Sequence, residues 1–412
     1  VRERWQLEGV IWTMVIAGIA TSTLGIMEAY NLYFKLDSVN GISFVRDDIL
    51  AGQFDYTSWY LPLFPQLASK DYNMASIVST FGNRNYLGTF AMFSAFFPLG
   101  FFFYYRNPAM KAISISLFSW MVYGLYITRC RAALLGVIAG VVFMFFMLVL
   151  FDRSWKFVRR HAVFFWIVGS VLVGGLIVSA VTAKSTDMWG KIRNTFTMDR
   201  TVSNTFERVW VWYATFRNWL DNPKLPLRSA EERNMIDMAQ ETGDLPARIS
   251  RWLVGGGYGS FKHFFPLQEA KTLDDENKET FAAVTFRQAH NDWLQVLAEL
   301  GVIGFGLLLW LVWRFFGGIY HAIKADMQGG RASDFRGDHV LLITLGAAMI
   351  SQLTAAVPDF PFHRIETALY AVIVLALVPV MAETVFFSRQ LPLATIDTVP
   401  NAPVWVGMLG VV

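Results

Sequence analysis

The sequence has few of the residues that a soluble domain or a cysteine-based site would need. Only 16% of its 412 residues are charged and 54% are hydrophobic, whereas soluble domains carry about 25% charged residues. The single cysteine, Cys130, excludes an internal disulfide framework and a cysteine metal cluster. A net charge of +3 argues against binding to nucleic acid, which requires a concentrated basic patch. The composition therefore predicts an integral membrane protein.

Long apolar runs are abundant, and about 20 such residues let a helix cross a bilayer. We predict eight spans: 9–31, 86–104, 110–128, 132–151, 162–182, 293–316, 338–356 and 366–384. Two stretches between them, 35–85 and 183–292, are rich in aromatic residues, and we expect them to be ordered. The predicted fold class is an all-α polytopic membrane protein. It forms a single membrane domain over residues 1–412 with a large ordered extracytoplasmic loop.

Basic residues in the short loops predict the orientation of the spans. The loops 105–111, 152–161 and 317–337 all carry lysine or arginine, and eight alternating spans place them on the same side. Short basic loops usually face the cytoplasm. The outward side then receives four segments: 35–85, the hairpin 128–131, 183–292 and the loop 357–365.

Arginines stand at the outward ends of two predicted spans. Arg84 lies at the mouth of an apolar span, between Asn83 and Asn85, and these asparagines are also typical helix caps. Arg129 and Arg131 occupy a short hairpin, where contact with lipid headgroups is the alternative to a specific site. Because a guanidinium group suits bidentate phosphate contacts, we predict that Arg131 binds phosphate.

The long stretch 183–292 contains two further motifs. Apolar residues at helical spacing over 206–220 predict a helix in the membrane interface that carries Arg208. Taken alone, Arg208 would be explained as a solvated side chain. The segment 255–261 predicts a tight glycine-rich turn, and Gly257 could help to cradle an anion with backbone N–H groups. No Lys-Ser/Thr pair follows it, which excludes a nucleotide P-loop.

Polar residues also mark the last outward segments. His290-Asn291 stands where the chain returns to the membrane, and histidine suits proton transfer near neutral pH, although a lone histidine is more often structural. Glu299 lies within the following span and must face protein or water rather than lipid. A short loop further on holds Asp359 and Arg364, which either pair with each other or complete a charged pocket.

These residues together predict a site for a lipid-linked diphosphate, because several arginines converge on one face beside lipid. One nearby histidine, His290, could deprotonate an attacking hydroxyl. We find no Asp-x-Asp motif and no spaced His/Cys/carboxylate cluster, so we expect neither a metal nor a cofactor. Guanidinium charge would instead neutralise the departing diphosphate. Supporting roles are predicted for Asn83, Asn85, Asn291, Glu299, Gly257, Asp359 and Arg364.

The same motifs resemble the superfamily of O-antigen ligases and O-antigen polymerases, bacterial glycosyltransferases of polysaccharide biosynthesis at the cell envelope. The resemblance rests on the segments 82–88, 129–136, the Arg208 helix with 255–261, and 290–304. Its most specific part is His290-Asn291-Asp292-Trp293-Leu294, followed by Glu299-x-Gly301. Asp359-Phe360-Pro361 is similar to an element of the polymerase-like branches.

The resemblance implies a C-type glycosyltransferase fold in the bacterial inner membrane, with the active site facing the periplasm. It implies metal-independent transfer of a glycan from undecaprenyl diphosphate to a hydroxyl of a glycan, lipid A core or protein. In the family, a histidine like His290 is the proposed base, and arginines like Arg131 and Arg208 bind the diphosphate. By the same resemblance we expect Arg84 to be a third contact to the diphosphate. Because only one predicted span precedes Gly82, the resemblance also implies that several N-terminal spans lie outside this chain.

Two other function classes stay open. A transporter of a small anion would place its polar groups near the midplane in broken helices, whereas here they cluster at helix ends and only Glu299 lies deeper. A structural membrane subunit that has lost activity is the second alternative. A ligase, a polymerase and a protein O-oligosaccharyltransferase use the same kind of donor, so all three remain possible within the leading hypothesis.

Overall fold

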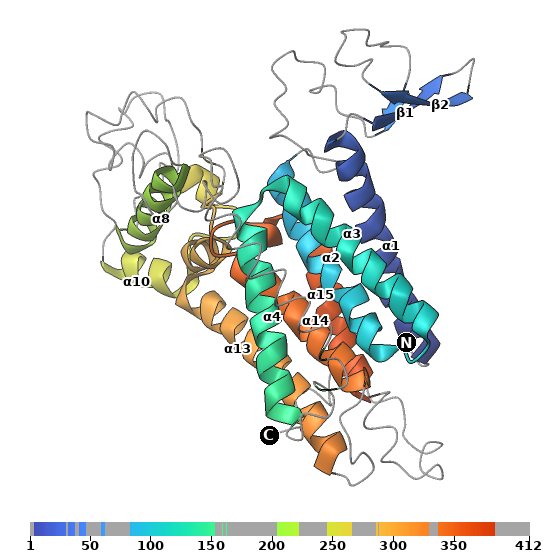
Figure 1. Cartoon of the computed structure of the whole chain (residues 1–412). Coiled ribbons are helices and arrows are strands. Elements are labelled where there is room, and N and C mark those ends of the chain that lie inside the picture. The colour runs from blue at the N-terminus through green and yellow to red at the C-terminus, as the bar shows by residue number, and fades with distance from the viewer. Residues whose placement is uncertain are drawn as a thin grey trace, which may run out of the picture.

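The computed structural model describes a bundle of apolar helices and part of the segments between them (Figure 1). Apart from Phe286 and two single residues, Arg159 and Ala162, the described ranges are 4–29, 32–37, 41–46, 59–61, 83–152, 204–221, 245–265, 288–328 and 337–383. Six described helices are long and apolar enough to cross a membrane. The chain is therefore a multi-pass membrane protein, as the composition predicts.

Helices occupy seven of the predicted spans. They are α1 (Arg4–Ala29), α2 (Arg84–Tyr104), α3 (Pro108–Thr128), α4 (Arg131–Phe151), α13 (Asp292–Gln328), α14 (Gly337–Ala355) and the shorter α15 (Ile365–Met381). The predicted span 162–182 lies outside the described residues. Helix α13 continues to Gln328 because Ile319, Ile323 and Asp326 recur at helical spacing and are buried.

Outside these helices, the described residues include one small sheet and two further helices. The strands β1 (Leu32–Asp37), β2 (Gly41–Arg46) and β3 (Trp59–Leu61) form an antiparallel sheet in the order β2-β1-β3. An all-α prediction does not include this sheet, although β-branched and aromatic residues in these segments favour strands. Helices α8 (Asn204–Asp221) and α10 (Leu245–Val254) lie together at one side of the bundle (Figure 1).

The centre of the bundle is formed by α2 and α14. Both are buried along most of their length, and α2 contacts α1, α3, α4 and α14. The side chains of Phe93, Phe97 and Phe101 on α2 are fully buried. Helix α15 joins this core through Tyr370, whose ring lies 4.7 Å from the Phe90 ring and whose hydroxyl donates to Met14 O at 3.0 Å.

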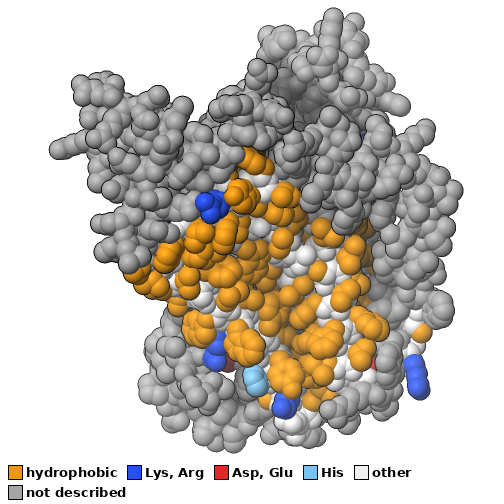
Figure 2. All heavy atoms as spheres, turned by 90° about the vertical axis from the view of Figure 1, so that its left-hand side faces the viewer, with side chains coloured by type: hydrophobic (Ala, Val, Ile, Leu, Met, Phe, Trp, Pro, Cys, Tyr) orange, Lys and Arg blue, Asp and Glu red, His pale blue; other side chains and the backbone are white. Residues whose placement is uncertain are grey.

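Helices α4 and α13 are among those that present apolar side chains to the outside. On α4 the exposed residues include Leu135, Val142 and Phe146, and on α13 they include Leu307 and Trp313. Figure 2 shows hydrophobic side chains covering the described part of this face, with basic side chains only at its edges. Such a face is favourable in contact with lipid. In water it would leave a large apolar patch exposed.

Helix α13 is broken near its beginning. Gly301 has φ 64° and ψ −169°, so the backbone leaves the helical conformation there and resumes it afterwards. A Cβ at Gly301 would lie 2.4 Å from the Leu253 carbonyl group at the end of α10, and one at Gly255 would lie 2.3 Å from the Glu299 carbonyl group. Two glycines therefore let the end of α10 cross the break in direct backbone contact.

Candidate functional site

Most of the predicted site residues gather at one end of the bundle. This end, called the His290 end below, is where α2, α4, α13 and α15 begin and where α1, α3 and α14 finish. Arg84 and Arg131 are the first residues of α2 and α4, Arg208 lies on α8, and His290 precedes α13. The alternation of helices thus brings together residues from four separate parts of the sequence.

Three arginines form a positive cluster at the His290 end. Arg131 is half-buried and lies close enough to Arg208 and Arg84 for their charges to repel. Such repulsion is strengthened where protein and lipid displace water. A bound anion with several oxygens would relieve it, and guanidinium groups bind phosphate oxygens well. Arg84, Arg131 and Arg208 are called the arginine cluster below.

A short turn before α15 closes over Arg208. The Nη1 of Arg208 donates a hydrogen bond to the Pro358 carbonyl oxygen. The next residue, Asp359, is only 3% exposed and lies in the field of Arg208. Burial raises the pKa of Asp359 to about 6. The charge of Arg208 and a hydrogen bond from the N–H of the next residue, Phe360, act in the opposite direction. Asp359 is thus a buried counter-charge to the cluster.

The buried thiol of Cys130 supports this placement. Its pKa is raised to about 12, mainly by burial and next by the charge of Asp359, whereas Arg208 lowers it. Cys130 immediately precedes Arg131. Asp359 and Arg208 therefore both lie close enough to the start of α4 for their charges to act on Cys130.

Arg364 does not pair with Asp359, which was one of the two predicted alternatives. In the described part of the chain no ion pair joins them. Instead the Arg364 guanidinium carbon lies 3.6 Å from the centroid of the Tyr86 ring and 5.3 Å from that of Phe360. Burial lowers the pKa of Arg364, and the Glu366 charge opposes this effect. Arg364 is therefore stacked on aromatic rings rather than grouped with the arginine cluster.

His290 lies in a strained backbone position beside the cluster. It has φ 51°, and its carbonyl oxygen accepts a hydrogen bond of 3.1 Å from Trp212 Nε1 on α8. Its ring packs edge-on against Phe360 at 4.8 Å, and its Nδ1 is buried with no partner among the described residues. Burial and then the Arg208 charge lower its pKa to about 4, so the imidazole is neutral at pH 7.

Two of the predicted supporting asparagines are helix caps. Asn83 Oδ1 accepts the Asn85 N–H at 2.8 Å and caps α2, and Asn291 Oδ1 accepts the Leu294 N–H at 3.0 Å at the start of α13. Asn85 contributes its carbonyl oxygen, which accepts from Thr89 Oγ1 at 3.0 Å. The capping interpretation therefore explains Asn83 and Asn291 without a ligand.

The glycine-rich turn is occupied by a protein carboxylate. Glu299 is 2% exposed, and its carboxylate accepts the Gly259 N–H at 2.9 Å and the Phe261 N–H at 3.3 Å. The Gly257 N–H donates to the Glu299 carbonyl oxygen at 2.8 Å. These N–H groups are committed within the protein, which corrects the predicted role of Gly257 as an anion contact.

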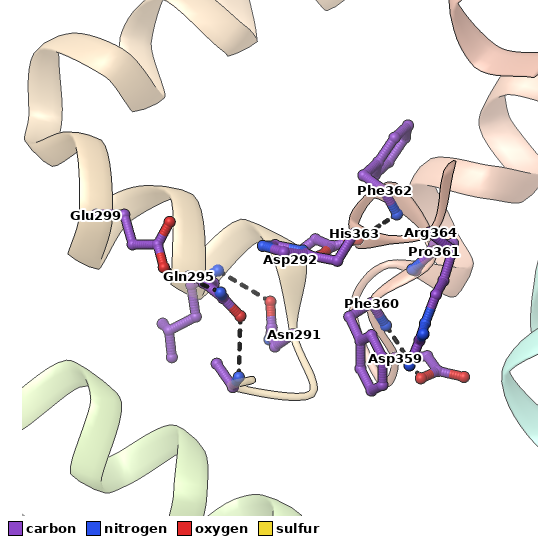
Figure 3. A network of polar contacts seen from close by, with 12 residues as sticks. Asn291, Asp292, Gln295, Glu299, Asp359, Phe360, Pro361, Phe362, His363 and Arg364 are labelled. Carbon is purple, nitrogen blue, oxygen red and sulfur yellow. Dashed lines mark hydrogen bonds and ion pairs between the residues drawn. The ribbon is translucent and has the colours of Figure 1, made fainter. Parts of the chain in front are cut away.

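Two residues near His290 escaped the sequence prediction. Asp292 is 3% exposed, and its Oδ1 is hydrogen-bonded to His363 Nδ1. Its Oδ2 accepts the Phe362 N–H at 2.8 Å (Figure 3). Asp292 lies in the motif that was singled out for His290, and His363 lies in the loop that was singled out for Asp359 and Arg364. The two residues come together only in the folded chain. In the described ranges no group of three or more His, Cys, Asp and Glu side chains is arranged to hold a metal.

Comparison with known proteins does not identify the chain. No protein-family model matches the sequence, and no curated protein matches it.

Proposed function

We propose that this protein is an inverting glycosyltransferase that moves a glycan from a lipid-linked diphosphate to a hydroxyl acceptor. The observation that carries the proposal is the arginine cluster, which brings Arg84, Arg131 and Arg208 together at the ends of membrane helices. A diphosphate on a lipid carrier fits this position, because its charge meets the guanidinium groups while its chain stays among the apolar helices. Undecaprenyl diphosphate is the donor that the sequence resemblance implies.

In the proposed reaction the arginine cluster stabilises the leaving group. The acceptor oxygen attacks the anomeric carbon from the side opposite the diphosphate, and the bond between that carbon and the phosphate oxygen breaks. Negative charge then grows on the diphosphate, and fixed guanidinium charges in a water-poor site stabilise it. Asp359 holds a counter-charge beside Arg208 before the donor binds.

The acceptor hydroxyl must lose its proton to a base at the same end of the bundle. His290 is the base that the resemblance implies, and it is neutral at pH 7 because burial lowers its pKa to about 4. A neutral imidazole can accept a proton, although so low a pKa makes it a weak base. We also propose that the His290 end faces outward from a bacterial cytoplasmic membrane, since the short basic loop that contains Arg106 lies at the other end.

The test of this proposal is turnover of a lipid-linked glycan by purified arginine variants. Arg208→Ala and Arg131→Ala should each lower kcat/KM by about 100-fold or more, by analogy with the loss of one charge-stabilising donor. Arg217→Ala, on the same helix α8, serves as the matched control and should retain most of the activity. Full activity in both cluster variants would rule out this function for the cluster.

One observation favours the alternative of an anion transporter, namely the break in α13 at Gly301. Transporters often bind substrate at such breaks. Here the break is packed against the backbone of Leu253 and Gly255. The glycosyltransferase proposal therefore has the better support, and uptake of phosphate or sulfate by liposomes containing the protein would reverse that preference.

A further inference from the structure

The Asp292–His363 pair has the arrangement that fixes a histidine as a base. A carboxylate bonded to one ring nitrogen sets both the orientation and the tautomer of the imidazole. The Asp292 carboxylate bonds His363 Nδ1, so this nitrogen carries the proton. The lone pair is then on Nε2, which has no partner among the described residues, and the side chain is 18% exposed. His363 Nε2 is therefore ready to accept a proton from outside the protein.

His290 has the opposite arrangement. Its Nδ1 is buried and has no hydrogen-bond partner in the described part of the chain. A buried N–H without an acceptor is rarer in proteins than a buried acceptor without a donor. The proton of neutral His290 is thus better placed on Nε2, and the lone pair on Nδ1 is closed off from an incoming hydroxyl. In this tautomer His290 presents a donor rather than a base.

Both histidines belong to one local structure at the arginine cluster. The turn that contains Phe362 and His363 also supplies the Pro358 carbonyl oxygen to Arg208 and the Phe360 ring to His290. Asp292 follows His290 by two residues and holds this turn through two hydrogen bonds (Figure 3). The turn that carries His363 therefore adjoins both Arg208 and His290.

We propose that His363, held by Asp292, is the base that takes the proton of the acceptor hydroxyl, and that His290 donates a hydrogen bond from Nε2 to an oxygen of the substrate. This inference rests on the proposed function. In the transfer step the O–H proton passes to His363 Nε2, and the electron pair of that bond forms the new bond to the anomeric carbon. The electron pair of the broken bond leaves with the lipid diphosphate.

The charges around His363 agree with this role. Burial lowers its pKa, but the hydrogen bond and charge of Asp292, together with the charge of Glu299, outweigh burial and raise the pKa above 6.5. Both carboxylates lie on α13, and Arg364 follows His363 on its own segment. His363 is thus the stronger base of the two histidines.

The decisive experiment is the pH dependence of kcat/KM for transfer by the unmodified protein. A base works only when deprotonated, so activity should fall about tenfold per pH unit below its pKa. If His363 is the base, this fall begins above pH 6.5. If His290 is the base, it begins near pH 4. A fall that begins only near pH 4 would overturn the inference, and no transfer at any pH would overturn the proposed function instead.

Variants separate the residues that titrate in this region. His363→Gln should lose about 100-fold to 10,000-fold in kcat/KM, the usual share of a general base, and should lose the pH dependence above 6.5. Inorganic pyrophosphate should still bind to it with little change, which shows that the cluster is intact. His290→Gln and Asp359→Asn should keep the pH dependence of the unmodified protein. Unchanged turnover in His363→Gln would show that His363 is not the base.

Discussion

At the scale of single residues, the arginines of the His290 end fall into two groups. Arg131 and Arg208 are close enough for their charges to repel. Arg208 also lies close to a buried carboxylate, Asp359. Arg364 instead faces the ring of Tyr86 at 3.6 Å. A stacked guanidinium group is held by the π-system and contributes less directly to binding an anion. The two groups should therefore respond differently to mutation.

Affinity for inorganic pyrophosphate measures this difference. Arg208→Ala should weaken binding by about tenfold or more, because it removes a charge-assisted contact worth about 1.5–3 kcal/mol. Arg364→Ala should weaken binding by less than about threefold, since a cation–π contact at a partly exposed site is worth about 0.5–1 kcal/mol. Titration calorimetry at constant ionic strength gives both values. Equal losses would place Arg364 in the cluster.

Glu299 illustrates a buried charge with a structural role. Its carboxylate holds the Gly259 and Phe261 N–H groups and also accepts Gln295 Nε2 at 3.1 Å. Glu299→Gln replaces a carboxylate, whose two oxygens both accept hydrogen bonds, by an amide whose NH₂ side cannot accept. We expect this substitution to lower the free energy of unfolding by about 1–3 kcal/mol.

Thermal unfolding in detergent tests the prediction for Glu299. Glu366→Gln is a suitable control, because Glu366 is exposed at the start of α15 and surface charges contribute less than about 1 kcal/mol. The account of Glu299 requires a clear drop in Tm for Glu299→Gln and little change for the control.

Sequence reasoning reached part of the site. It singled out Arg84 and Arg131 because charged residues beside apolar spans are unusual and easily seen, and it added Arg208 only in combination with them. It did not find the Asp292–His363 pair, because the two residues are far apart in sequence and each has an ordinary local explanation. It predicted the tight glycine-rich turn but offered an external anion as a partner for Gly257, since the carboxylate that fills the turn comes from Glu299 on another helix. Tertiary partners of this kind leave no local pattern.

At the scale of elements, the contact between α10 and α13 depends on two glycines, Gly255 and Gly301. The break at Gly301 and the positive φ of Gly255 allow two backbones to meet where a Cβ would lie within 2.6 Å of backbone atoms. This contact places Glu299 under the glycine-rich turn. The spans themselves were predictable from apolar runs, but the break was not, because glycine alone does not distinguish a kink from close helix packing.

Gly301→Ala tests the importance of this contact. A residue with a side chain at φ 64° and ψ −169° is strained by about 1–3 kcal/mol, and the collision with the Leu253 carbonyl group adds to that cost. We expect a marked fall in Tm in detergent. Gly306→Ala is the matched control on the same helix, because its Cβ would meet nothing within 4 Å, and it should be neutral or stabilise α13 by up to about 1 kcal/mol. A neutral Gly301→Ala would contradict the account of the break.

At the scale of the whole molecule, the helices separate two chemically different ends. The His290 end holds the arginine cluster, His290, His363 and the turn before α15, and the opposite end holds short loops such as the one that contains Arg106. The distribution of basic residues between short loops predicts that Arg106 faces the cytoplasm. A donor assembled on a lipid carrier would then reach the cluster from the outer leaflet.

Cysteine labelling tests this orientation. The natural cysteine, Cys130, is only 2% exposed and gives a low background. Tyr258→Cys, at a position that is 83% exposed near the His290 end, should react with a membrane-impermeant maleimide in right-side-out vesicles. Arg106→Cys should react only after permeabilisation. The reverse pattern would place the cluster in the cytoplasm and contradict the proposed topology.

The central claim is transfer of a glycan from a lipid diphosphate that arginines, rather than a metal ion, stabilise. The most direct measurement is turnover by the purified protein with an undecaprenyl-diphosphate-linked glycan, a hydroxyl acceptor and excess chelator. The account predicts release of the lipid diphosphate, a transferred glycan with inverted anomeric configuration, and a rate that the chelator does not change. Absence of transfer, retention of configuration or loss of activity with the chelator would contradict it.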